Sequence, residues 1–206
     1  MTKERQSPLI RGTTPATREE TWCLPLVIGG SLVGHSSFPP KAVFPGSFNP
    51  LHHGHTGLAA VAAARLGVEV HFELSVTNAD KPELPRAEVE RRVRQFAGVA
   101  PVWVTRAATF EAKASLFPGA AFVLGWDTAV RVVDPKYYGG EPGCDAALRA
   151  LLDRGCRLVV GGRIDASGAF RIWDADALGD EFAGLFVPLT EADFRADVSS
   201  TELRRR

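Results

Sequence analysis

The sequence lacks a net charge and any long apolar run. Its 206 residues contain 24 Lys and Arg against 24 Asp and Glu, so no overall field attracts nucleic acid or an anionic membrane surface. The longest apolar stretches, such as 22–30 and 120–125, fall far short of the ~20 residues of a transmembrane helix. Residues 1–14 mix both charge signs and contain no apolar signal core. We therefore expect a soluble, cytoplasmic protein with no nucleic-acid or membrane partner.

Cysteine is also scarce. Cys23, Cys144 and Cys156 form no CxxC pair and have no zinc-ligand spacing. We expect reduced, packed thiols, and a disulfide between Cys144 and Cys156 stays open as an alternative.

Length and composition predict one catalytic domain. The hydrophobic content of 45% is enough for a sizeable core. Residues 1–40 are read as an N-terminal arm and linker of unknown role, in which 21–30 form an edge strand or a packed arm. The domain itself is expected to span 41–206.

From residue 41 onward, short apolar runs alternate with amphipathic segments. The runs predict strands near 41–44, 68–76, 101–105, 120–125, 156–162 and 184–189, with residues 170–173 as a hairpin strand. Between them, helices are predicted near 54–66, 86–96, 110–116, 127–133 and 145–152. This alternation predicts an α/β fold, a Rossmann-like open parallel sheet with helices on both faces.

The stretch GSFNPLHHGH, residues 46–55, lies between the first predicted strand of this fold and its first helix. Ligands of open α/β sheets bind at such strand-to-helix loops. Gly46 permits close backbone approach and Ser47 adds a hydroxyl, while His52 and His55 lie three residues apart at the helix start. Such donors suit a polyphosphate. A zinc site, which lacks a third ligand here, and a plain polar loop remain the alternatives.

A second hydroxyl-rich segment lies near the other end of the sequence. SSTELRRR combines hydroxyls, a possible helix start and an arginine, which together suit phosphate. The residues concerned are Ser199, Ser200, Thr201 and Arg204.

With GSFNPLHHGH at 46–55 and VSSTELR at 198–204, the chain resembles the HxGH-motif nucleotidyltransferase superfamily. Among its members, the sequence is most similar to nicotinamide and nicotinate mononucleotide adenylyltransferases. The resemblance covers residues 41–206. It implies the nucleotidylyltransferase fold, an activity of the EC 2.7.7 type and a role in NAD biosynthesis.

The resemblance also implies a reaction and its residues. AMP passes from ATP to a small phosphorylated acceptor, with Mg²⁺ carried by the ATP phosphates and with no protein metal site. His52 and His55 would be catalytic. The nucleotide or its phosphates would be bound by Gly46, Ser47, Phe48, Asn49, Gly54, Gly125, Asp127, Ser199, Ser200, Thr201 and Arg204.

Three further residues are candidates for substrate binding: Asn78, Lys81 and Arg163. Each follows a predicted strand, and a solvated surface position is the alternative for Lys81 and Arg163. Asp127 has the alternative role of a helix cap. Arg91, Arg92 and Arg94 alternate with glutamates on one helix, which predicts a solvated face without a functional role.

The sequence does not decide the acceptor or the oligomeric state. An adenylyltransferase for another phosphomonoester, such as phosphopantetheine, would share every motif residue. A non-catalytic nucleotide-binding module is the alternative from a different functional class, and a homo-oligomer stays open.

Overall fold

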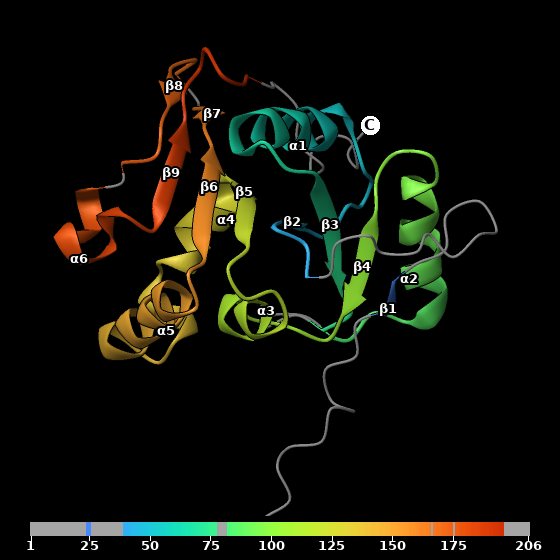
Figure 1. The fold of residues 1–206 in the computed structure, drawn as a ribbon, viewed down its shortest axis with the longest axis horizontal. Coiled ribbons are helices and arrows are strands. Elements are labelled where there is room, and N and C mark those ends of the chain that lie inside the picture. The colour runs from blue at the N-terminus through green and yellow to red at the C-terminus, as the bar shows by residue number, and fades with distance from the viewer. Residues whose placement is uncertain (1–23, 26–38, 78–81, 166, 175, 196–206) are drawn as a thin grey trace, which may run out of the picture.

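The computed structural model describes residues 24–25, 39–77, 82–165, 167–174 and 176–195. Its strands form a seven-stranded sheet in the order β1-β4-β3-β2-β5-β6-β9 (Figure 1). All neighbours are parallel except β1, which pairs with β4 antiparallel at one edge. The strands are β1 (Leu24–Pro25), β2 (Ala42–Pro45), β3 (Val70–Ser75), β4 (Val102–Thr105), β5 (Ala121–Gly125), β6 (Arg157–Gly161) and β9 (Phe186–Leu189).

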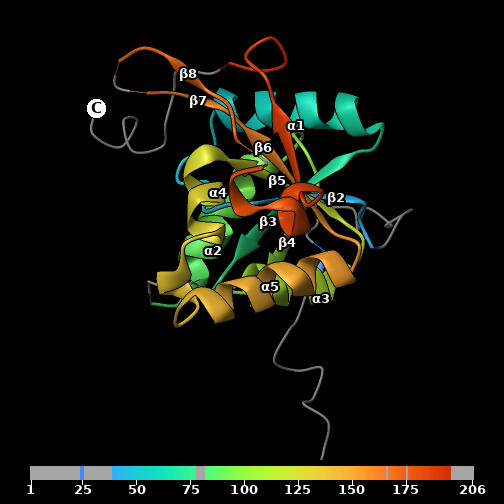
Figure 2. The ribbon, with the colours of Figure 1, turned by 90° about the vertical axis from the view of Figure 1, so that its left-hand side faces the viewer.

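Helices cover both faces of this sheet, as predicted. In Figure 2 the sheet lies between α1 on one side and α3 and α5 on the other. The helices are α1 (His53–Leu66), α2 (Arg86–Val93), α3 (Phe110–Leu116), α4 (Trp126–Val132), α5 (Glu141–Asp153) and α6 (Asp180–Ala183). The α/β class and the Rossmann-like parallel sheet are therefore confirmed.

The two faces carry separate apolar clusters, and β5 shows why. Phe122 and Leu124 pack into the cluster with α3, α4 and α5, whereas Val123 packs into the cluster with α1. All three side chains are fully buried. Successive strand residues point to opposite faces, so a strand covered on both sides reads as a continuous apolar run.

The strand order reverses at the centre of the sheet. The chain moves outward from β2 through β3 to β4, then returns to β5 on the other side of β2 and continues through β6 to β9. The carboxyl ends of β2 and β5 therefore lie at a topological switch point, where open α/β sheets bind ligands.

The structure also tests two predictions about short strands at the periphery of the fold. Phe170–Arg171 (β8) pairs with Arg163–Ile164 (β7) in a separate two-stranded hairpin, which confirms the hairpin strand. The pairing of β1 confirms an edge strand at residues 24–25.

Cys144 and Cys156 are free and buried. Among the helices of the described ranges, none has the length and apolarity to cross a membrane.

Candidate functional site

The loop from Gly46 to His52 connects β2 at the switch point to the N-terminus of α1. This helix has 14 residues and no acidic side chain in its first turn, so its positively polarised end is not neutralised from within. The last strand residue, Pro45, pairs with Glu73 of β3, and the Gly46 N–H donates to the Glu73 carbonyl at 2.9 Å. This segment, residues 46–52, is the motif loop, and its first residue is hydrogen-bonded to the sheet.

His52 and His55 form a stacked pair at the start of α1. Their ring centroids are 3.8 Å apart with 27° between the ring planes. The backbone N–H of His52 donates to Nδ1 of His55 at 3.3 Å. Because Nδ1 of His55 accepts, its proton must sit on Nε2, which leaves Nε2–H as a donor.

The environment keeps both rings neutral. Burial, and secondarily the charge of His52, lowers the pKa of His55 from 6.5 to about 3. Burial, with a smaller effect of His53, also lowers the pKa of His52. The ring of His55 packs edge-on against Phe48 and Phe44, at centroid distances of 5.0 and 5.9 Å. His55 therefore offers a fixed, uncharged donor at neutral pH.

Phe48 is one of the predicted nucleotide-binding residues. Its side chain is 1% exposed and packs against Phe72 and Phe96, so a contact with a nucleotide would have to come from its backbone. Its backbone has a φ of 43°, which non-glycine residues rarely adopt. A Cβ on Gly46 would lie 2.6 Å from the Phe48 ring, so glycine is needed there. The Phe48 ring therefore packs under the loop and restricts the conformation of its backbone.

Three side chains of the segment 86–96 hold the motif loop from the side. Arg92 Nη1 donates to the Ser47 carbonyl at 2.9 Å, and Arg91 Nη2 donates to Asn49 Oδ1 at 2.6 Å. Gln95 donates to the Phe48 carbonyl at 3.0 Å. Gln95 Oε1 accepts a hydrogen bond from the backbone N–H of Leu51 at 2.8 Å.

The prediction of a solvated arginine face was wrong for Arg92, which is buried. The Glu and Arg spacing correctly indicated its ion pair with Glu88 at 2.7 Å. That pair is local, however, and the contact with Ser47 spans 45 residues. A local sequence pattern does not predict a contact between residues so far apart in the chain.

Gly125 and Asp127 lie at the carboxyl end of β5, on the far side of the switch point from β3. Gly125 is the N-cap of α4, and Asp127 lies in its first turn. The structure brings together two predicted residues here, since Arg163 donates to Asp127 in an exposed ion pair. Gly54 is buried in the first turn of α1.

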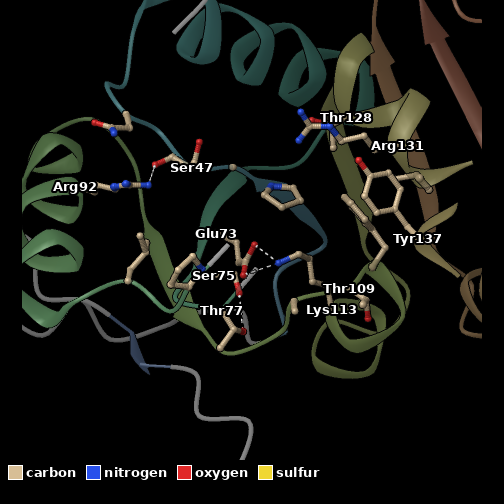
Figure 3. A pocket seen from close by; sticks show the side chains of 18 of the residues that line it. Ser47, Glu73, Ser75, Thr77, Arg92, Thr109, Lys113, Thr128, Arg131 and Tyr137 are labelled. Atoms are coloured by element: carbon tan, nitrogen blue, oxygen red, sulfur yellow. Dashed lines mark hydrogen bonds and ion pairs between the residues drawn. The ribbon is translucent and has the colours of Figure 1, made fainter. Parts of the chain in front are cut away.

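A pocket of about 450 Å³ opens beside the motif loop (Figure 3). This volume is within the usual range for small-molecule sites. Gly46, Ser47 and Asn49 contribute to its wall. The other lining residues are Pro45, Glu73, Ser75, Thr77, Pro82, Leu84, Arg92, Ala108, Thr109, Phe110, Lys113, Thr128, Arg131, Val132, Tyr137 and Tyr138.

A buried ion pair supports the base of this pocket. Lys113 Nζ lies 2.9 and 2.8 Å from the two carboxylate oxygens of Glu73 and donates to the Ala107 carbonyl at 2.7 Å. Thr105 donates its hydroxyl to the same carboxylate. Glu73 is fully buried and Lys113 is 5% exposed. The pair ties β3, β4 and α3 together, and sequence reasoning missed it.

The remaining predicted residues lie outside the described ranges. These are Asn78, Lys81, Ser199, Ser200, Thr201 and Arg204. Within the described ranges, no three His, Cys, Asp or Glu side chains cluster as a metal site.

Together, the reversed strand order, the loop at the switch point and the uncharged histidine donors are typical of α/β proteins that bind nucleotides. A family model described as cytidylyltransferase-like matches residues 43–206, and the chain belongs to this family. Membership supports a general nucleotidyltransferase activity. No curated protein matches the chain.

Proposed function

We propose that the chain transfers the adenylyl group of ATP to the phosphate of a small acceptor, with nicotinamide or nicotinate mononucleotide as the first candidates. The observation that carries this proposal is the adjacency of two features. The histidine pair lies at the N-terminus of α1, and the 450 Å³ pocket opens beside the loop that leads into it.

In the proposed reaction, an oxygen of the acceptor phosphate attacks the α-phosphorus of ATP. A new P–O bond forms, and the bond from the α-phosphorus to the bridging oxygen of the β-phosphate breaks. Pyrophosphate leaves with the electron pair. Such transfer requires positioning and charge stabilisation, and no protein nucleophile is needed.

The residues of the motif loop have distinct roles in this proposal. His55 donates Nε2–H to a phosphate oxygen as negative charge builds, and the positively polarised N-terminus of α1 adds to that stabilisation. His52 stacks on His55 and fixes its orientation. Gly46 lets the Phe48 ring pack under the loop at the wall of the pocket.

Magnesium enters this reaction with the substrate. The described residues offer no carboxylate cluster for it, and Mg²⁺ commonly stays bound to substrate phosphates and water. Ser199, Ser200, Thr201 and Arg204 are proposed to hold the β- and γ-phosphates. Asn78 and Lys81 are proposed to contact the acceptor.

Asp127 in the first turn of α4 and Arg163 at the start of β7 form an ion pair, which gives them a joint role in the proposal. We assign the pair to the nucleotide side of the site, because it lies beyond β5 and does not line the pocket.

The test is a screen for pyrophosphate release with the full chain. ATP and CTP are each combined with nicotinamide mononucleotide, nicotinate mononucleotide and phosphopantetheine. We expect release with ATP and a pyridine mononucleotide. Release only with phosphopantetheine would show that the acceptor is not a pyridine mononucleotide. Release only with CTP would show that the donor is not ATP. ATP binding without release from any pair would indicate a non-catalytic nucleotide-binding module.

A further inference from the structure

The cationic side chains that line the pocket differ in how far they are already engaged in hydrogen bonds and ion pairs within the protein. Three cationic side chains reach its wall: Arg92, Lys113 and Arg131. The exposure of each cation, the balance of its charge by a carboxylate and the hydrogen-bond donors it still has available decide which of them can bind a substrate anion.

Lys113 has no donor left for a ligand. An ammonium group has three N–H donors. They are taken by Glu73 Oε1, Glu73 Oε2 and the Ala107 carbonyl, at 2.9, 2.8 and 2.7 Å. Its charge is also neutralised by the Glu73 carboxylate. This lysine therefore supports the pocket and does not attract an anion into it.

Arg92 is committed to the motif loop. Its Nε donates to Glu88 at 2.7 Å and its Nη1 to the Ser47 carbonyl at 2.9 Å. Its side chain is 10% exposed, and its charge is balanced by Glu88. Arg92 therefore stabilises the pocket wall by holding the motif loop in place.

Arg131 differs from both. It lies in the last turn of α4, three residues after Thr128, so the two side chains share one helix face. Both line the pocket, on the wall opposite Ser47 (Figure 3). Within the described part of the chain, the guanidinium of Arg131 has no hydrogen-bond or ion-pair partner. All five of its N–H donors are available to a ligand.

We infer that Arg131 binds the phosphate of the acceptor and so positions its attacking oxygen beside the motif loop. This inference rests on the proposed function. A planar guanidinium binds phosphate through two parallel hydrogen bonds, which fixes orientation as well as charge. The hydroxyl-bearing residues Ser75, Thr77 and Thr109 also line the pocket, and they suit an uncharged polar part of the ligand.

Phosphate groups of ATP share the same chemistry, but the site of Arg131 favours the acceptor. The histidine pair does not line the pocket, whereas Arg131 does. In-line displacement requires the attacking and leaving groups on opposite sides of the α-phosphorus. With the triphosphate on the histidine side of the motif loop, an acceptor bound by Arg131 approaches from the pocket side.

The test compares ligands that differ only in the phosphate. Binding of nicotinamide mononucleotide, nicotinate mononucleotide and phosphopantetheine is measured by calorimetry against their phosphate-free forms, the two ribosides and pantetheine. The full chain, Arg131→Gln and Arg131→Lys are used. Arg94→Gln is the matched control, because Arg94 is exposed and its guanidinium pairs with Glu90, at 3.7 Å, outside the pocket.

We expect the wild-type chain to bind one phosphorylated ligand about 10- to 100-fold more tightly than its phosphate-free form. In Arg131→Gln this preference should fall to within about threefold, and Arg131→Lys should restore part of it. The affinity for ATP should stay unchanged, and Arg94→Gln should behave as wild type.

Three results would overturn the inference: a phosphate preference that survives in Arg131→Gln, an equal loss of ATP affinity, or no phosphate preference in the wild-type chain. Pyrophosphate release is scored separately. A phosphate preference that depends on Arg131 without any release would refute the proposed function and leave Arg131 as a phosphate-binding residue without a role in transfer.

Discussion

The protonation of His55 is the feature of the site that pH can test most directly. Burial lowers its pKa in the folded chain to about 3 from 6.5. Below pH 6.5 the unfolded chain therefore gains a proton at this residue, and the folded chain does not until near pH 3. The unfolding free energy contributed by His55 must fall as the pH falls through this window.

The size of the effect follows from the two pKa values. The full difference corresponds to about 5 kcal/mol, at about 1.4 kcal/mol per pH unit. Between pH 7 and pH 5 the linkage relation gives a loss of about 2 kcal/mol. That loss is an upper range, since the ring is partly exposed and water screens it.

The comparison variant is His55→Asn, because an Asn side-chain oxygen can accept from the His52 N–H as Nδ1 does. Urea unfolding of both proteins at pH 7, 6 and 5 should show the wild type losing up to about 2 kcal/mol more than the variant. His53→Asn, which alters an exposed neighbour, should follow the wild-type profile. Parallel profiles for wild type and His55→Asn would refute a buried, neutral His55.

Three more predictions concern the frame of the site. Lys113→Met should cost about 3–5 kcal/mol in thermal or urea unfolding, because it strands the buried carboxylate. The double change with Glu73→Gln should cost less than Lys113→Met alone, and a larger loss would refute the pairing. Gly46→Ala should destabilise by about 1–3 kcal/mol through its clash with Phe48, and Phe48→Leu should relieve part of that cost in differential scanning fluorimetry. Gln95→Ala should raise the KM of both substrates by loosening the loop, and unchanged kinetics would show that the loop needs no such support.

The main elements were predictable because their signals are local. The run from Ala121 to Gly125 reads as a buried strand whichever neighbours it pairs with, and a Gly-rich loop before an amphipathic segment marks a helix start. The histidine pair was predictable for the same reason, since three residues of spacing at a helix start place two rings side by side.

The pocket and its supports were not predictable, because they depend on the order and register of the strands. Glu73 and Lys113 are 40 residues apart and meet only because β3 lies beside β4 and α3 follows β4. The burial of the Phe48 ring was not predictable either, because its motif position suggested a ligand contact and the turn of the chain directs the ring into the core.

The central claim is that an uncharged His55 donor accelerates nucleotidyl transfer. The direct measurement is acceptor-dependent pyrophosphate release by wild type and His55→Asn, with ATP binding and thermal unfolding recorded for both. We predict a fall in kcat of about 10²–10³ in the variant, with ATP still bound and the fold intact. A variant that turns over at the wild-type rate would contradict the account.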